Sequence, residues 1–126
     1  MSTLTVQTIS NGTVSTSSEN VIRGSARAWV NFDGTNSSIR SAYNVASITK
    51  NGTGDYNINF TNAMPNNLYS ASGICMGGGG SNNQGQFISA PQTTSGTSAS
   101  SLRIQVRFST NNALNDVDTI SVQVFA

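Results

Sequence analysis

Histidine is absent from this 126-residue chain, and cysteine occurs only once, as Cys75. Without histidine the chain cannot form a Ser-His-Asp triad, a Cys-His dyad or most catalytic zinc sites. A single thiol makes no intrachain disulfide and no metal cluster, and the apolar neighbours Ile74 and Met76 indicate that Cys75 is a small buried residue. The sequence therefore predicts a non-enzymatic protein with no catalytic residues, no metal and no cofactor.

Charge is scarce as well. The chain has six Lys and Arg and five Asp and Glu, so that charged residues make up 9%, whereas ordinary globular domains contain about 25%. No cluster of basic residues could neutralise a row of phosphates, and nucleic-acid binding is not expected. Asp116 and Asp118 are the one close acid pair, and we interpret them as solvated turn and strand-start residues rather than as the carboxyl pair of a polysaccharide-cleaving enzyme.

Long apolar runs are missing too. No stretch approaches the 18 residues of a membrane-spanning helix, so we expect no membrane insertion. Residues 1–6 lack the basic and apolar regions of a signal peptide, which predicts synthesis in a host cytoplasm.

The composition is dominated by Ser, Thr, Asn and Gly, as in some disordered chains, but the net charge is only +1 and β-branched residues alternate regularly with polar ones. We therefore expect a folded β protein with polar loops.

Apolar residues alternate with polar ones along most of the chain, which predicts strands. The expected strands lie at residues 4–8, 26–32, 39–49, 56–60, 68–76, 87–88, 102–108 and 120–124. A change of phase near Ala46 indicates a β-bulge, and Asn51-Gly52 predicts a hairpin between the flanking runs. Residues 10–19 are interpreted as a polar loop, and no helix longer than one turn is expected.

These elements predict an all-β fold, a single antiparallel, jelly-roll-like β-sandwich of about eight strands with little or no helix. The expected organisation is an N-terminal leader strand and flexible attachment segment over residues 1–22, followed by the sandwich domain over residues 23–126.

Two features are candidates for recognition. The glycine-rich loop after the strand at 68–76 is followed by neither lysine nor helix, so it is not a phosphate-binding loop. We interpret it as a receptor-contact loop, because loops on a rigid scaffold often carry recognition. Its candidate residues are Gly79, Ser81, Asn82, Asn83 and Gln84. Trp29, the only tryptophan, lies opposite the apolar face of its strand, and it is either an interface or core aromatic or a platform for stacking on a sugar.

The centre of the chain resembles a segment of bacteriophage virion proteins, especially tail-fibre and minor tail proteins, including those of marine and cyanobacterial phages. The resemblance rests on AWVNFDGT at 28–35, IR at 39–40, YNVASIT at 43–49, NGTGDY at 51–56, Phe60 and AMP at 63–65. The closing DVDTISVQVF at 116–125 and the opening STLTVQTI at 2–9 look like the end and the leader of such proteins.

This resemblance implies a structural protein of the virion and brings no catalytic residues with it. The expected function is that of a tail-fibre or tail-tip component that contacts the host surface, and the alternative is a capsid decoration (cement) protein that stabilises the head. Expected partners are further copies of the chain in a homotrimer, other virion proteins of tail or capsid, and host surface glycan. Closed symmetry suits a chain with little charge and a modest core.

Overall fold

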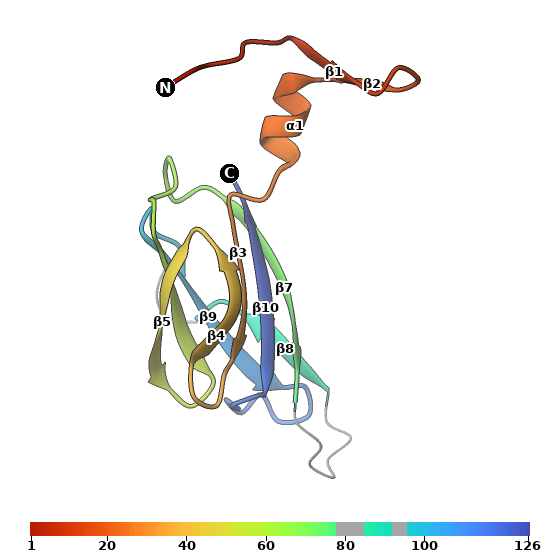
Figure 1. Ribbon diagram of the computed structural model, residues 1–126. Coiled ribbons are helices and arrows are strands. Elements are labelled where there is room, and N and C mark those ends of the chain that lie inside the picture. Colours follow the sequence, from red (N-terminus) through yellow and green to blue (C-terminus); the bar gives the residue numbers. More distant parts are fainter. Residues whose placement is uncertain (78–84, 92–95) are drawn as a thin grey trace.

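The computed structural model describes residues 1–77, 85–91 and 96–126. Two four-stranded antiparallel sheets form a sandwich, and an N-terminal arm projects from one end of it (Figure 1). One sheet has the strand order β4-β3-β10-β7, and the other has the order β5-β6-β9-β8. The predicted all-β sandwich is confirmed.

The strands of the first sheet are β3 (Ala28–Asp33), β4 (Ser38–Tyr43), β7 (Ser70–Met76) and β10 (Thr119–Phe125). The strands of the second sheet are β5 (Val45–Gly52), β6 (Asp55–Phe60), β8 (Gln86–Ser89) and β9 (Ser101–Phe108). The chain changes sheet after β4, β6, β7 and β9, and β10 returns to pair with β3 at the centre of the first sheet. The hairpins β3–β4, β5–β6 and β8–β9 each lie within one sheet, so the sandwich is shown but the predicted jelly-roll strand order is not.

The core lies between the central strands of the two sheets, because these strands alternate apolar and polar residues and face each other with their apolar sides. Phe32 of β3 and Tyr56 of β6 meet edge to face, with ring centroids 5.4 Å apart, an arrangement that aromatic rings favour. The other buried apolar residues are Ala28, Val30, Ile58, Phe60, Met64, Leu102, Ile104, Val106, Val117, Ile120, Val122 and Val124. The edge strands β4, β5, β7 and β8 remain mostly exposed or half-buried.

The run predicted as one strand over residues 39–49 is in fact two strands in different sheets, β4 and β5. Asn44 separates them with a left-handed φ of 55°, which ends the alternation and directs the chain across the sandwich. Asparagine adopts this conformation more readily than most residues. The predicted bulge near Ala46 is confirmed, because the register of β5 against β6 passes from Val45–Phe60 to Ser47–Asn59.

The N-terminal arm, residues 1–25, differs from the prediction. Leu4 and Val6 belong to no strand; instead β1 (Thr8–Ser10) pairs with β2 (Ser15–Ser17) in a small hairpin. The segment predicted as loop, residues 10–19, thus holds the turn of this hairpin, strand β2 and the start of helix α1 (Ser18–Gly24), which exceeds the single turn expected. The Ser17 hydroxyl caps the helix by accepting a hydrogen bond from the Asn20 amide at 3.2 Å.

Candidate functional site

Two aromatic side chains lie next to each other on the outer face of the first sheet. Trp29 of β3 is the register partner of Tyr43 of β4, and their exposed fractions are 38% and 57%. Directly opposed residues in adjacent strands have Cβ atoms about 5 Å apart, so the two side chains form one surface, called here the aromatic strip. Gln123 of β10 continues the row beside Trp29. A strip of this kind can stack on a sugar ring or pack against a protein surface.

The sequence pattern places Trp29 opposite the apolar face of its strand, which leaves both a core and an exposed position open, and it does not single out Tyr43. Alternation alone groups Tyr43 with Ile39, Ser41 and Val45 on one side. In the structure the half-buried Ala42 is the β4 residue that packs against the core, opposite Val30. The signal that could have revealed this is the hairpin itself, since an exposed Trp29 requires its register partner on β4 to be exposed as well.

Asn44 holds together the end of the sandwich that carries the arm. Its Nδ2 donates hydrogen bonds to the carbonyl oxygens of Arg27 at 3.0 Å and Asn62 at 3.1 Å. Its Oδ1 accepts one from the Asn62 amide at 2.7 Å. A groove of about 240 Å³ opens beside it. The groove is lined by Arg27, Tyr43, Asn44, Asn62, Ala63, Met64 and Pro65. Sequence analysis did not single out Asn44, although an asparagine between two alternating runs was the available signal.

The carboxylate of Asp55 on β6 is almost fully enclosed by side-chain donors. Arg103 binds both of its oxygens at 2.8 Å, Gln105 Nε2 donates at 2.8 Å and Asn51 Nδ2 donates at 3.2 Å. These bonds, above all those from Arg103, lower the pKa of Asp55 from 3.8 to about 2. A carboxylate with four such bonds has no lone pair left for a reacting group, so this network holds β6 against β9 rather than supplying an acid or base.

The carboxylate of Asp116 is likewise bound by several hydrogen-bond donors. Lys50 Nζ lies 2.7 Å from its Oδ2, and its Oδ1 accepts from the Gly54 amide at 2.8 Å and lies 2.7 Å from the buried Tyr56 hydroxyl. Burial pushes the pKa of Asp116 upward, but the hydrogen bonds from Lys50, Gly54 and Tyr56 outweigh it and lower that pKa. Its neighbour Asp118 is exposed. The two acids of the candidate pair therefore lie in unlike surroundings, and one of them already has its partners.

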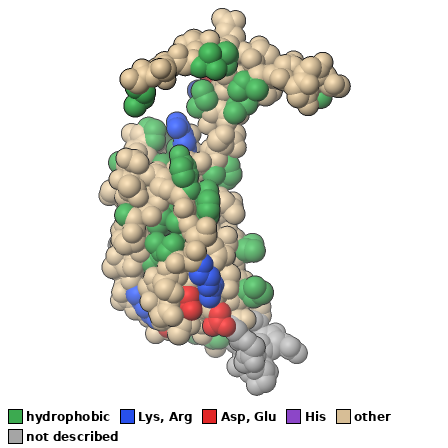
Figure 2. Space-filling view, viewed as in Figure 1, with side chains coloured by type: hydrophobic (Ala, Val, Ile, Leu, Met, Phe, Trp, Pro, Cys, Tyr) green, Lys and Arg blue, Asp and Glu red, His purple; other side chains and the backbone are tan. Residues whose placement is uncertain are grey.

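The charged groups of the sandwich gather at the end away from the arm. The ion pairs Asp33–Arg40, Lys50–Asp116 and Asp55–Arg103 involve the strands and loops of that end. Figure 2 shows most of the red and blue side chains of the visible face near this end, while apolar side chains extend towards the arm. Most charged groups of the sandwich thus lie at the end away from the arm, called here the charged end, while Arg27 lies at the arm-bearing end.

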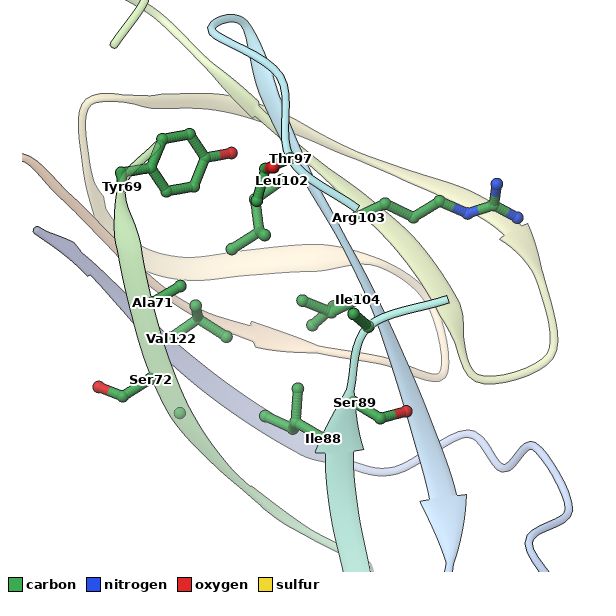
Figure 3. A pocket seen from close by; sticks show the side chains of 12 residues that line it. Tyr69, Ala71, Ser72, Ile88, Ser89, Thr97, Leu102, Arg103, Ile104 and Val122 are labelled. Carbon is green, nitrogen blue, oxygen red and sulfur yellow. The ribbon is translucent and has the colours of Figure 1, made fainter. Parts of the chain in front are cut away.

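A pocket of about 320 Å³ opens where the edge strands β7 and β8 diverge (Figure 3). Tyr69, Ala71, Ile88, Leu102, Ile104 and Val122 give it an apolar lining. The polar groups at its margin are occupied: the Tyr69 hydroxyl donates to the Ser101 carbonyl oxygen at 2.9 Å, and Arg103 holds Asp55. The pocket can accept an apolar group. Its described lining contains the hydroxyl groups of Ser72, Ser89 and Thr97 but no carboxylate, thiol or lysine that could activate one of them.

Reactive and metal-binding groups are not gathered anywhere in the described ranges. Cys75 is half-buried and packs against the core, and burial raises the pKa of its thiol, which disfavours the nucleophilic thiolate. Residues 1–77, 85–91 and 96–126 contain no group of three or more Cys, Asp or Glu placed to hold a metal ion. Within the same residues no helix is long and apolar enough to cross a membrane.

The predicted receptor-contact loop cannot be placed. Its candidate residues lie outside the described part of the chain, namely Gly79, Ser81, Asn82, Asn83 and Gln84. The described residues that flank the loop, Met76 at the end of β7 and Gln86 at the start of β8, lie at the end of the sandwich away from the arm (Figure 1). The receptor-contact role of the loop stays a sequence-based prediction.

Comparison with protein-family models, with curated proteins and with solved structures found no match to this chain. What the molecule can do therefore has to be argued from its own residues. They define an all-β sandwich with a projecting arm, an exposed aromatic strip and a separate charged end.

Proposed function

We propose that this chain is a non-enzymatic structural component of a bacteriophage particle, a small oligomeric module of the tail that contacts the host surface. The observation that carries the proposal is the resemblance of residues 28–65 to virion proteins. In the structure these residues form β3, β4, β5, β6 and the connection after them, so the resembling segment supplies half of the sandwich and its aromatic strip.

The surface chemistry supports a binding role over a catalytic one. Four of the five acidic side chains are in ion pairs, with Arg23, Arg40, Lys50 and Arg103. A glycan-cleaving enzyme needs two carboxyl groups free to face one bond, whereas Asp55 and Asp116 are held by several donors each. A neutral surface rich in Ser, Thr and Asn, with an exposed Trp29, suits weak contacts to glycan that gain strength from several copies.

The presence and position of the chain in the virion are tested by mass spectrometry of purified particles with a quantified copy number. A few to a few dozen copies per particle support the tail.

A glycan array with the purified oligomer tests the host contact. The proposed host contact would be contradicted if the oligomer binds no glycan on the array and if phage carrying this protein with residues 77–85 scrambled still adsorb normally. Release of sugar from host polymer by the purified protein would contradict the non-enzymatic part of the proposal.

A capsid decoration protein is the second candidate, and the arm favours it. A projecting segment with exposed apolar side chains is what a protein that clamps a larger shell would bury. Copy number separates the two functions, since hundreds of copies per particle indicate the capsid.

A further inference from the structure

The N-terminal arm has no core of its own. None of residues 1–25, all of which the structure describes, is buried. Seven large apolar side chains of the arm are exposed, those of Met1, Leu4, Val6, Ile9, Val14, Val21 and Ile22. A hairpin with three-residue strands and a seven-residue helix is too short to be stable alone in water. The arm therefore needs a surface against which these side chains can pack.

The solvent-accessible area of the chain is larger than that expected for a compact monomer of the same mass. The accessible area is 7681 Å², whereas a compact monomer of 13.1 kDa exposes roughly 6,400 Å². The excess of about 1,300 Å² is more than the about 800 Å² that each partner contributes to a standard protein interface. The area left exposed is thus sufficient for a stable oligomer.

The aromatic strip is the surface that matches the arm. Trp29 and Tyr43 lie on the first sheet near the arm-bearing end, beside the groove lined by Tyr43, Met64 and Pro65. Leu68, which precedes β7 at the same end, is 85% exposed. The arm supplies aliphatic side chains, and this end supplies aromatic ones and a groove.

The arm of a chain does not pack against the aromatic strip of the same chain. Ser25, which caps the C-terminus of α1, has an extended backbone, with φ −86° and ψ 137°. Figure 1 shows α1 leading away from the sandwich, with the hairpin and the N-terminal stretch running crosswise above its end. The next backbone bond, from the Arg27 amide to the Val124 carbonyl oxygen at 2.7 Å, already belongs to the sandwich. The arm is therefore free to reach a neighbouring molecule.

A second copy is the occupant that satisfies both surfaces. Each copy has one arm and one aromatic strip. In a ring in which the arm of each copy contacts the strip of the next, both surfaces are covered in every copy. A different protein bound to the arm alone would leave the strip exposed. Few charged groups lie near this contact. Glu19 and Arg23 of the arm pair with each other at 2.8 Å, the exposed Arg27 lines the groove beside Tyr43, and the ion pairs of the sandwich lie at the opposite end. A contact between two different surfaces closes into a ring when the rotation allows it.

We propose that the oligomer forms by arm exchange, in which the N-terminal arm of one copy packs across the Trp29–Tyr43 strip of the next. This inference rests on the oligomeric state in the proposed function and adds its geometry. It places the contact between copies at the arm-bearing end of the sandwich and leaves the charged end free.

The sole tryptophan is the reporter for the first experiment. Native mass spectrometry and acrylamide quenching of Trp29 fluorescence are measured on the full chain, on an arm variant (Leu4→Ser with Val6→Ser) and on a control (Met76→Ser). Met76 is 64% exposed on the same sheet but at the charged end. We expect an oligomer with a shielded Trp29 for the full chain and the control. For the arm variant we expect a dissociation constant at least about tenfold higher and a red-shifted, quenchable Trp29.

The second experiment asks whether arm and strip contact each other. A strip variant (Trp29→Ser with Tyr43→Ser) keeps its arm, and the arm variant keeps its strip. Each alone should be mostly monomeric at the lowest concentration at which the full chain is still oligomeric, and each should retain a cooperative unfolding transition because the substituted side chains are exposed. Mixed together, with one copy isotopically labelled, they should form a one-to-one complex through the one intact contact.

Several outcomes would overturn the inference. These are a monomeric full chain with a quenchable Trp29, a strip variant that assembles as well as the full chain, and a mixture that forms no mixed complex. The particle measurement is independent of all three. A chain found in virions but monomeric in solution contradicts arm exchange alone, and an arm-exchanged oligomer absent from virions contradicts the proposed function alone.

Discussion

Arg103 holds both carboxylate oxygens of Asp55, with Nε 2.8 Å from Oδ1 and Nη2 2.8 Å from Oδ2. This contact lowers the folded-state pKa of Asp55 from 3.8 to about 2. The stabilisation is therefore complete above about pH 4 and is lost as the pH falls towards 2. We expect acid to remove about 2 kcal/mol of the free energy of unfolding through this group alone, measured by urea unfolding at a series of pH values.

Asp55→Asn is the matched variant for the acid experiment. It should be less stable than the parent at pH 7, because Arg103 loses its charged partner, and its stability should change less between pH 4 and 2. Glu19→Gln, which breaks the exposed Glu19–Arg23 pair of the arm, should have little effect. Parallel pH profiles for the parent and Asp55→Asn would contradict the assignment.

The buried phenol of Tyr56 makes the folding stability depend on pH in the alkaline range. Burial, followed by the hydrogen bond to Asp116, raises the pKa of its phenol above the ordinary value of 10.0. A raised folded-state pKa means that the stabilisation is present below about pH 10 and is lost above it. We expect the phenolate absorbance of Tyr56 to appear only together with unfolding. In Tyr56→Phe that part of the absorbance change should be absent, and a Tyr56 signal that rises before unfolding would refute the expectation.

Asn44 combines a left-handed backbone with three side-chain hydrogen bonds. Asn44→Ala should lower the free energy of unfolding by about 2–4 kcal/mol, since it loses the bonds and also strains the backbone. Asn44→Gly, which removes only the bonds, should lower it by less. Chemical denaturation measures both, and equal losses would mean that the backbone conformation contributes nothing.

Gly34 is packed so tightly that a side chain cannot be accommodated. A Cβ at this position would lie 2.7 Å from the Tyr56 hydroxyl and 2.8 Å from both Ile120 Cδ1 and the Val117 carbonyl oxygen. We expect Gly34→Ala to cost about 2 kcal/mol or more, because the turn must move away from the core. Gly52→Ala is the control, since nothing lies within 4 Å of its Cβ. Equal thermal stability of the two variants would contradict this packing.

The sandwich strands were predictable because their signal is repeated within each strand. In β9, Leu102, Ile104 and Val106 are all buried, so three consecutive alternations carry the same information. Helix α1 is only seven residues long, and a period of 3.6 cannot be recognised over two turns. Its cap by Ser17 and its Glu19–Arg23 pair were visible only as residue types in a polar run.

The candidate site was less predictable than the fold, because it depends on pairing across strands. Trp29 was found from one strand, but Tyr43 was not, since its orientation depends on which residue of β4 faces Val30. Simple alternation puts Ile39 and Tyr43 on one side of β4, but the register shift against β3 places Ile39 opposite Phe32 and Tyr43 opposite Trp29. The enclosure of Asp55 joins residues that are 48 and 50 positions apart in the chain, and no local pattern encodes that distance.

The pairing of Ala28 with Val124 also bears on the order of events during synthesis. A ribosome completes β3 long before it makes β10, and until then β3 and β7 have no strand between them. Contacts so distant in sequence slow folding, and the apolar face of β3 stays open in the meantime. The first sheet can therefore close only once almost all of the sandwich has been translated, and until then the unpaired edge of β3 is a surface on which nascent chains can associate wrongly.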